Sequence, residues 1–312
     1  MRLRVSTLAP CPVAARQGHP IARAGPGRPE PARGRRGKLR VMLPPLSEPH
    51  PLDERVIRAF RADGHVRIDG LASPAEVAAY RPALLEAGAK GRYDQRPLDE
   101  RDTYGKAFVQ MFNLWTKDER VRAFVCAPRF ARAAAELMGV SGVRLYHDQA
   151  LFKEPAGGFT PWHQDQFYWP LDTEHTVTLW MPLVPVTPEM GPMTFASGSQ
   201  RLGKLSDLAI SDESEAAFQR AVDEHALPCT APEAFAPGDA TFHAGWTLHR
   251  APPNRTATMR EVMTVIYFAD GTRVGPLDHP NRRFDRDVWL PGCEPGQPAA
   301  SPKNPLLWQR GA

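Results

Sequence analysis

Two histidines and one aspartate are the residues of this chain best suited to bind a metal ion. His163 and Asp165 are two positions apart, and His249 follows His163 after 86 residues. Residues i and i+2 of an extended strand point to the same side, so His163 and Asp165 can reach one ion. Such a His-x-Asp pair often arises by chance and is weak evidence by itself. The distal histidine completes a set of two imidazoles and one carboxylate.

An arginine near the distal histidine indicates what else the site binds. Arg260 lies eleven residues after His249, and no other histidine downstream of His163 has an arginine at that distance. Two imidazoles and a carboxylate hold Fe(II) and leave coordination positions open, whereas a structural zinc site favours thiolates. A buried guanidinium group pairs with a carboxylate through two hydrogen bonds. The pattern predicts Fe(II) with a 2-oxo acid and O2 at its open positions.

Several neighbouring residues have two possible interpretations. His243 is a second candidate for the distal ligand and otherwise a buried neighbour of the site. His147 and Asp148 are adjacent and point to opposite faces of a strand, so we do not expect them to share an ion. Gln149 is a candidate for binding cosubstrate or substrate, or an ordinary polar strand residue. Three aromatic residues after the metal motif either line an apolar substrate pocket or belong to the core: Phe167, Tyr168 and Trp169.

Short strands are predicted to position these residues. From Val143 onward, runs rich in Val, Leu, Tyr, Phe, Thr and Met are separated by Pro and Gly turns. The predicted strands are 143–153, 175–184, 193–196, 240–243 and 261–268, with one helix at about 211–224. Helical periodicity dominates the N-terminal half, at 53–62, after the Ser73 cap, at 117–125 and at 128–138, with Pro82 expected to kink or end its helix. We therefore predict a mainly β fold with flanking helices, a double-stranded β-helix (jelly-roll, cupin-like) barrel with N-terminal helices packed on one side.

Residues 146–268 resemble the phytanoyl-CoA dioxygenase family of Fe(II)/2-oxoglutarate oxygenases. The resemblance extends over most of residues 55–270, beginning at Gly64-His65-Val66, and its combined motif is specific. The matching pieces are Trp162-His163-Gln164-Asp165-Gln166-Phe167-Tyr168, Leu179-Trp180-Met181-Pro182-Leu183, Gly191, Ser197-Gly198-Ser199, Pro237-Gly238-Asp239, and His249 with Asn254, Thr256 and Arg260.

The resemblance implies a role for individual residues. His163, Asp165 and His249 would bind iron, Arg260 would bind the C5 carboxylate of 2-oxoglutarate, and Trp180 would lie near this cosubstrate. Where the family often has a serine two residues after the distal histidine, this chain has Ala251. We expect Thr256 to supply the missing hydroxyl, with Thr258 as the alternative. Gln200 replaces the histidine of the family's Gly-Ser-His turn.

The implied reaction is hydroxylation of an unactivated C–H bond in a small molecule, with release of succinate and CO2. A secondary metabolite or a lipid-like acid is the expected substrate class. Because Asp165 fills the ligand position that chloride would need, we expect hydroxylation and not halogenation. Two alternatives remain open. The first alternative to a hydroxylase is a catalytically inactive binding module of the same fold. The second is a cupin-like metal isomerase or hydrolase that works without 2-oxoglutarate.

The positive charge of the chain is concentrated in its first residues. The 312 residues carry a formal net charge of +4, of which residues 1–41 contribute +9 and the remainder −5. We therefore do not expect a nucleic-acid partner for the body. Residues 1–45, rich in Pro and Arg, are predicted to form a disordered tail. A transit segment, or a true start at Met42, are the alternatives.

The rest of the chain divides into two predicted parts. Residues 50–271 form the expected dioxygenase domain, and residues 272–312 an irregular C-terminal tail. The four cysteines are widely spaced without a CxxC pair, so we expect reduced thiols. No apolar run approaches the roughly 18 residues of a membrane span. We expect a cytoplasmic monomer or homodimer, or an organellar protein if residues 1–41 are a transit segment.

Overall fold

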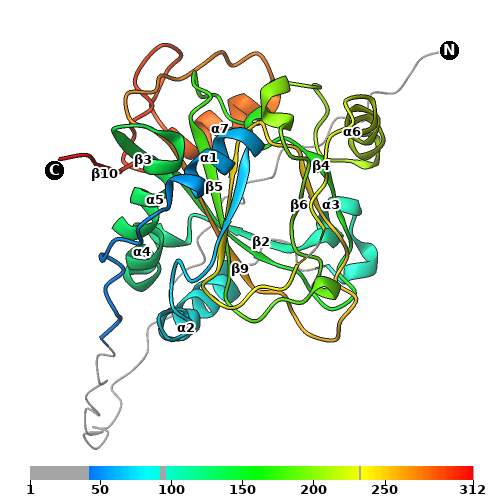
Figure 1. The fold of residues 1–312 in the computed structure, drawn as a ribbon, viewed down its shortest axis with the longest axis horizontal. Helices are drawn as coiled ribbons and strands as arrows, with labels where there is room; N and C mark the ends of the chain where they lie inside the picture. Colours follow the sequence, from blue (N-terminus) through cyan, green and yellow to red (C-terminus); the bar gives the residue numbers. More distant parts are fainter. Residues whose placement is uncertain (1–41, 92–95, 232, 312) are drawn as a thin grey trace, which may run out of the picture. The chain divides into compact units, whose positions relative to one another are not determined.

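The computed structural model describes residues 42–91, 96–231 and 233–311 (Figure 1). The predictions of a disordered tail, a transit segment or an alternative start concern residues 1–41 and lie outside the described residues. Residues 42–312 form one unit by themselves. Within the part that the structure describes, no helix is both long and apolar enough to cross a bilayer.

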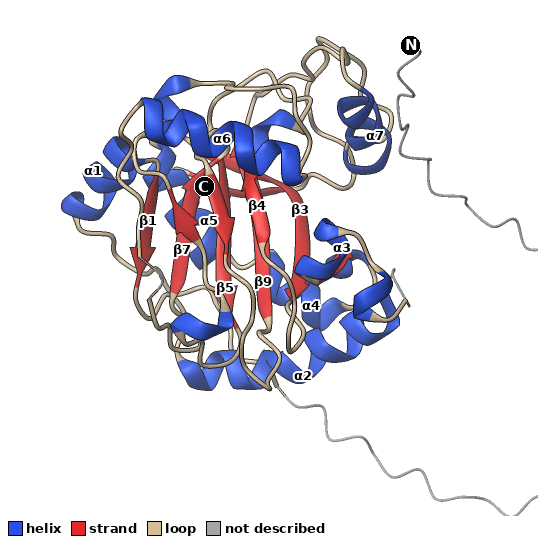
Figure 2. Ribbon diagram, turned by 90° about the vertical axis from the view of Figure 1, so that its right-hand side faces the viewer, coloured by secondary structure: helices blue, strands red, loops and turns tan. Residues whose placement is uncertain are grey.

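Two antiparallel sheets carry the residues of interest. Seven strands form the larger sheet, in the order β1-β7-β5-β9-β3-β10 with β2 also paired to β3, and the smaller sheet has the order β4-β8-β6. Figure 2 shows β1, β7, β5, β9 and β3 of the larger sheet side by side. The strands are β1 (His65–Ile68), β2 (Val109–Phe112), β3 (Gly142–Phe152), β4 (Thr160–His163), β5 (Thr176–Pro182), β6 (Thr194–Phe195), β7 (Ala240–Ala244), β8 (His249–Ala251), β9 (Val262–Ala269) and β10 (Leu306–Gln309).

The strand pattern confirms the predicted class of fold and corrects one detail of it. Antiparallel sheets with flanking helices agree with the jelly-roll prediction. The strands form two separate sheets and not a closed barrel. The helices are α1 (Glu54–Asp63), α2 (Pro74–Gly91), α3 (Thr103–Ala107), α4 (Glu119–Val125), α5 (Pro128–Met138), α6 (Asp212–Glu224) and α7 (Pro280–Trp289).

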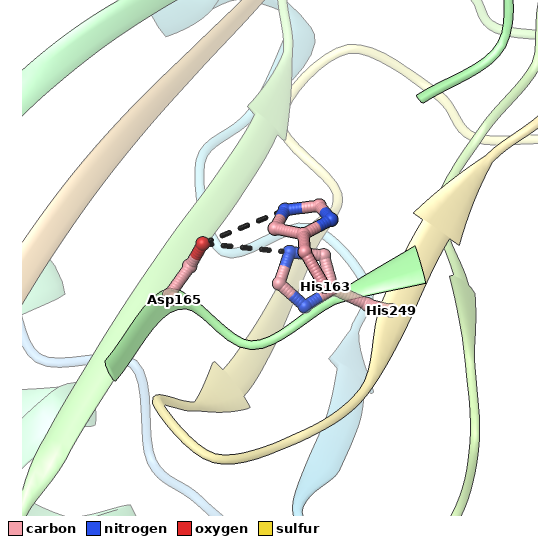
Figure 3. A group of neighbouring side chains, drawn as sticks. All are labelled: His163, Asp165 and His249. Carbon is pink, nitrogen blue, oxygen red and sulfur yellow. Dashed lines mark ion pairs between the residues drawn. The ribbon is translucent and has the colours of Figure 1, made fainter. Parts of the chain in front are cut away.

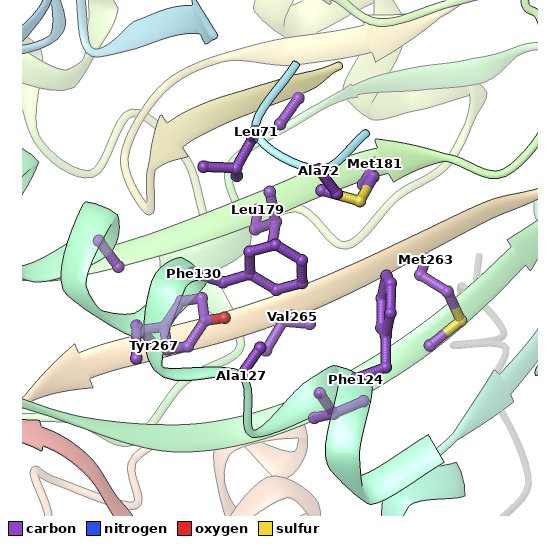
Figure 4. Packing of buried hydrophobic residues seen from close by; sticks show 14 of the residues in the cluster. Leu71, Ala72, Phe124, Ala127, Phe130, Leu179, Met181, Met263, Val265 and Tyr267 are labelled. Carbon is purple, nitrogen blue, oxygen red and sulfur yellow. The ribbon is translucent and has the colours of Figure 1, made fainter. Parts of the chain in front are cut away.

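N-terminal helices cover one face of the larger sheet, as predicted. Alternate residues of β5 and β9 point to this face, and Leu179 and Val265 are fully buried there. Figure 4 shows Phe124 of α4 and Phe130 of α5 packed against these strands. Helix α5 begins with proline at its first turn and ends at Gly139, whose positive φ of 74° suits glycine. The opposite face of the sheet is therefore left for the smaller sheet and the site.

The structure decides against one alternative for Pro82 and corrects the expectation for the C-terminal segment. Pro82 does not end its helix, because α2 runs through it to Gly91. The segment after Gly271 is not irregular throughout, because it contains α7 and β10. Helix α7 has local sequence signals, namely proline at its first turn and a His279 side chain that accepts from the Asn281 amide. Strand β10 pairs with β3, which no local signal could reveal.

Candidate metal centre

His163, Asp165 and His249 converge between the two sheets (Figure 3). His163 ends β4 and pairs directly with His249 at the start of β8. Asp165 Oδ1 lies 3.6 Å from His163 Nε2 and 3.7 Å from His249 Nε2. One nitrogen or oxygen atom from each residue lies within 4.8 Å of the others, a spacing that one metal ion can bridge.

The chain reaches this geometry by a different route from the one predicted. We expected a strand to continue from His163 through Asp165. Instead β4 ends at His163, and Asp165 begins the 3-10 turn η3 (Asp165–Phe167). Only Gln164 between them keeps extended dihedral angles. That single extended residue is enough to bring the two side chains to one point.

Backbone carbonyls fix which ring nitrogen of each histidine faces the centre. His163 Nδ1 lies 2.8 Å from the Pro161 carbonyl, and His249 Nδ1 lies 2.9 Å from the Thr247 carbonyl. A carbonyl oxygen only accepts, so each Nδ1 carries the proton and each Nε2 presents a lone pair. Burial lowers the pKa of both histidines to about 4, which keeps the rings neutral near pH 7.

The larger sheet holds the second oxygen of Asp165. Thr178 Oγ1 donates to Asp165 Oδ2 at 3.1 Å, and His243 Nε2 lies 3.2 Å from the same oxygen. Thr178 and His243 are direct partners across β5 and β7, so they present one polar surface. Because Oδ2 is engaged, Oδ1 is the oxygen left to face His163 and His249. His243 therefore lies behind the carboxylate, in the role of buried neighbour that the sequence left open.

The charge of Asp165 is set by opposing effects. Burial by itself would raise the pKa of this carboxyl group. His249, the contact with His243, and His163 outweigh burial and hold the pKa well below its usual range. The centre thus combines two neutral imidazoles with one carboxylate, the donor set that suits Fe(II).

A buried cation lies near the end of β8. Arg260 is 1% exposed, and among the described residues it has no carboxylate within ion-pair distance. One of its nitrogens donates to the Gly191 carbonyl, whereas its Nε has no partner. Burial lowers its pKa to about 9. Buried charges in proteins are normally paired, so this group fits a carboxylate ligand.

Trp180 and Gly191 shape the surroundings of that cation. The Arg260 guanidinium lies 5.7 Å from the centre of the Trp180 ring, whose indole Nε1 is also buried without a partner. Gly191 has φ of 70°, and a side chain there would meet the Pro252 carbonyl. Glycine at this position therefore lets its carbonyl approach Arg260. A carboxylate has about four lone-pair sites, so it can accept hydrogen bonds from both unpaired donors, Arg260 Nε and Trp180 Nε1.

Lys153 is a second buried basic side chain, which sequence reasoning missed. Its backbone pairs with that of Arg260, and its Nζ donates to the carbonyls of Gly158 and Pro252 at 2.6 and 3.0 Å. Burial, and then the charge of Arg260, lower the pKa of Lys153 to about 6. With that pKa the Lys153 amine is largely neutral near pH 7, and an anion beside it and Arg260 would favour its protonated form. This pair also fits a carboxylate.

Comparison with known proteins identifies the family. The family model described as phytanoyl-CoA dioxygenase (PhyH) matches residues 60–262. This chain belongs to that family. The match includes the three metal-facing residues and Arg260, and ends at the first residue of β9.

Two curated relatives of this phytanoyl-CoA dioxygenase family member act on small molecules by name. A methylphosphonate hydroxylase from Gimesia maris is 26% identical over 220 residues, which are 70% of this chain and 81% of the relative. A probable alpha-ketoglutarate-dependent hypophosphite dioxygenase from Stutzerimonas stutzeri is 30% identical over 131 residues. That second match covers 41% of this chain and 46% of the relative, so it spans about half of the relative's length.

Solved structures of similar proteins extend over most of the chain. The non-heme alpha ketoglutarate dependent carbocyclase SnoK from nogalamycin biosynthesis has a TM-score of 0.68 and 26% identity, and the alignment covers 83% of this chain and 99% of SnoK. The epimerase SnoN, in complex with Fe3+, alpha ketoglutarate and nogalamycin RO, has a TM-score of 0.65 and 28% identity, with coverage of 82% and 98%. The jelly-roll fold expected from the sequence is thus confirmed.

Thr256, whose hydroxyl we expected to bind the cosubstrate in this family member, forms its hydrogen bonds within its own turn. Thr256 Oγ1 donates within its own turn, to Asn254 Oδ1 at 2.7 Å or the Thr258 carbonyl at 3.2 Å. Thr258 is exposed, and its hydroxyl contacts that of Thr256. The contacts of both hydroxyls therefore lie within the turn, and none of them directs a hydroxyl toward Arg260.

Thr160 is a better-placed hydroxyl that the sequence did not suggest. Thr160 pairs directly with Ala251, the position where the family often has serine. Ala251 and His249 are two residues apart in β8 and share one face, and directly paired residues also share a face. Thr160 therefore lies on the metal-facing side. Its Oγ1 is buried without a partner, so the hydroxyl is free to bind a ligand.

The structure places the remaining predicted site residues in different surroundings. Gln149 is in register with Thr264 and Trp180 across β3, β9 and β5, and it accepts from Gln110 Nε2 at 2.7 Å. Trp169 packs in a buried cluster with Tyr146, the core alternative left open by the sequence. The other two aromatic residues contact later parts of the chain. Phe167 meets His279, which lies beyond the family match, with ring centres 4.9 Å apart. Tyr168 accepts from the amide of Ile210, which lies just before α6.

Proposed function

We propose that this protein is an Fe(II)/2-oxoglutarate-dependent dioxygenase that hydroxylates an unactivated C–H bond of a small molecule. The observation that carries the proposal is the convergence of His163, Asp165 and His249, together with the buried guanidinium of Arg260, whose Nε has no partner. The family membership and the names of the relatives support the same reaction class. A secondary metabolite or lipid-like acid is the proposed substrate class, and succinate and CO2 are the proposed coproducts.

Each group of residues has a separate task in this proposal. His163 and His249 give their Nε2 atoms to iron, and Asp165 gives Oδ1 because Thr178 and His243 hold its other oxygen. Bound Fe(II) with 2-oxoglutarate supplies the activation of O2 that oxidises a C–H bond, as the cosubstrate becomes succinate and CO2.

Another set of residues binds and orients the cosubstrate. We assign the C5 carboxylate of 2-oxoglutarate to the Arg260 guanidinium, Trp180 Nε1 and Thr160 Oγ1; Arg260 Nε and the other two atoms are buried without partners of their own. Their burial excludes water and strengthens each interaction. Gln149 stands two register rows from Thr178, on the same sheet face, and is assigned to the substrate side of that face.

The presence of Asp165 favours hydroxylation over halogenation, because the carboxylate takes the ligand position that chloride would need. A second candidate outcome is oxidation without oxygen insertion, because the two similar solved structures are named as a carbocyclase and an epimerase. Product analysis separates these outcomes. Hydroxylation adds one oxygen atom to the substrate, whereas ring closure or epimerisation does not.

Anaerobic titration of the purified apoprotein with Fe(II) and 2-oxoglutarate tests the proposal. We expect the weak visible charge-transfer band that appears when a 2-oxo acid chelates protein-bound Fe(II). His163→Ala, which removes one imidazole ligand, serves as the control and should not show the band. Absence of the band in the wild-type protein would favour an inactive binding module. Turnover without 2-oxoglutarate and without succinate release would favour a metal isomerase or hydrolase.

A pair of threonine variants tests the assignment of the hydroxyl partner. Thr160→Val keeps the shape of the side chain but removes the hydroxyl, and we expect the apparent affinity for 2-oxoglutarate to fall about tenfold or more. The reason is that a hydrogen bond to a charged group contributes about 1.5–3 kcal/mol. Thr256→Val is the matched control, with affinity near that of the wild type. The charge-transfer titration measures both. The reverse order of effects would restore the role first expected of Thr256.

A further inference from the structure

Strand β4 contains a bulge that determines the direction of His163. Thr160 pairs with Ala251 and His163 pairs with His249, so three steps along β4 match two steps along β8. The extra residue is accommodated at Pro161 and Trp162. Without a bulge, residues three apart would point to opposite faces, whereas here Thr160 and His163 share one. The metal-facing position of His163 therefore depends on this local irregularity.

A bulge leaves backbone groups without regular partners, and helix α6 satisfies them. Pro161 has no amide hydrogen, and its carbonyl accepts from the His163 ring. The Trp162 amide donates to Glu215 Oε2 at 2.7 Å, and the Trp162 carbonyl accepts from Ser214 Oγ at 3.2 Å. Figure 1 shows α6 beside β4. One carboxylate thus receives the amide that the bulge would otherwise leave unpaired.

The same helix also holds the tryptophan side chain. Gln219 lies one turn after Glu215 and accepts from the Trp162 indole at 3.0 Å. Phe218 and Val222 of α6 form a buried cluster with Trp162. Ser211 caps the helix in a capping box, which fixes the first turn that carries Glu215. Because the ring and the amide of Trp162 are both fixed, the strand has little freedom to change register next to His163.

Glu215 reaches the second ligand strand as well. Its Oε1 accepts from Arg250 at 2.9 Å, and Arg250 directly follows His249. The Arg250 guanidinium also lies 4.6 Å from the centre of the Trp162 ring. Because this ion pair is partly exposed, its direct stabilisation is small. The geometric effect is larger, since one carboxylate joins the residue before His163 to the residue after His249.

We propose that Glu215 is a positioning residue for the metal centre, acting through the β4 bulge and not by contact with the metal. The inference rests on the proposed function, because it assumes that His163 and His249 bind one ion. When the acceptor is removed, the Trp162 amide loses its partner at a buried position, which is unfavourable. A shift of the bulge relieves that cost, and the same shift turns His163 away from His249.

Metal binding to the full-length apoprotein tests this role without measuring activity. Co(II), which accepts imidazole and carboxylate ligands, is titrated and followed by its visible absorption. We expect Glu215→Ala to weaken Co(II) binding about 10- to 100-fold, as removal of residues that orient metal ligands does. Glu215→Gln keeps an oxygen acceptor for the Trp162 amide and should bind close to the wild-type value. Rescue by glutamine would separate the hydrogen bond from the charge.

Glu213→Ala is the matched control. Glu213 is an exposed acid in the same first turn of α6. Its removal therefore takes the same charge from the same helix end as Glu215→Ala but leaves the contacts with β4 unchanged. We expect normal Co(II) binding in this variant. Thermal unfolding of each apoprotein, followed by circular dichroism, shows whether the variants are folded at the titration temperature. If Glu215→Ala does not fold, Glu215→Asp supplies the test, with weaker Co(II) binding expected because the shorter side chain withdraws the acceptor from the Trp162 amide.

Three outcomes would overturn the inference. Wild-type affinity in folded Glu215→Ala, or in Glu215→Asp where that variant replaces it, would overturn the positioning role alone. Equal losses in Glu215→Gln and Glu215→Ala would show that the amide acceptor is not the operative contact. A wild-type protein that binds no Co(II) would instead overturn the proposed metal centre, and the positioning role with it.

Discussion

His249→Ala is expected to abolish iron binding and the coupled release of succinate. The variant leaves His163 and Asp165 as the only members of the metal-facing set, and His243 is held on the far oxygen of Asp165. Changes in residues that merely orient metal ligands cost about 10- to 100-fold in metal affinity. Loss of a ligand should cost more than about 100-fold on that scale. Iron content after anaerobic loading, together with succinate release, measures the effect.

His225→Ala provides the control for that variant. His225 is exposed at the C-terminal end of α6, so its removal tests whether loss of any histidine affects iron loading. We expect iron content and turnover at the wild-type level. A His249→Ala protein that still binds one equivalent of iron would contradict the ligand assignment. In that event His243 becomes the distal ligand, the alternative that the sequence left open.

Arg260→Ala is expected to raise the 2-oxoglutarate requirement by about 30-fold or more while metal binding alone persists. Truncating one partner of a buried hydrogen-bonded charge pair costs about 2–5 kcal/mol, and each 1.4 kcal/mol is tenfold in affinity. Arg260 is buried and its Nε has no protein partner, so the cosubstrate would lose its main cation. Succinate release at increasing 2-oxoglutarate concentration, and the charge-transfer titration, give the shift.

Two further substitutions sharpen the interpretation of Arg260. Arg255→Ala removes an exposed arginine from the same connection and should leave the requirement unchanged. Arg260→Lys keeps a positive charge but loses the planar fork, so an intermediate requirement is expected. Unchanged affinity in Arg260→Ala would mean that Lys153, the other buried basic side chain, is the principal carboxylate partner.

The three residues that converge at the candidate metal centre could be predicted from the sequence because the signals that select them are short-range. His163 and Asp165 form a short motif, and the distance from His249 to Arg260 selects the distal histidine over His243. The structure brings the three together as the motif suggests, although a turn at Asp165 replaces the expected strand. The error about the strand did not affect the prediction of the site, because the single extended residue between His163 and Asp165 is enough to bring both side chains together.

Thr160 could not be predicted, because its direction depends on pairing and not on spacing. Three residues separate it from His163, and regular alternation would place the two on opposite faces. Only the pairing of Thr160 with Ala251 reveals that β4 is bulged. Thr256, which sits at a family motif position, was chosen in its place although its hydroxyl is engaged within a turn. Lys153 was missed for another reason, since lysines are almost always exposed.

The elements of the fold were easier to predict than their arrangement. The strands around residues 143–152 and 262–269 are rich in β-branched and aromatic residues, and their positions follow from composition. Their neighbours in the sheet follow from long-range packing. Helix α7 was missed because Pro and Gly flank it closely, even though its start carries a recognisable cap.

The position of β9 in the larger sheet has a consequence for biosynthesis. Strand β9 lies between β5 and β3 and pairs with both, although it comes after almost all other strands in the chain. A nascent chain therefore presents two unpaired strand edges until residues 262–269 have left the ribosome. Unpaired edges and exposed apolar faces promote aggregation of partly made chains. Translation speed over the segment from β5 to β9, and the chaperones present during it, should thus control the yield of folded protein more than the stability of the finished fold does.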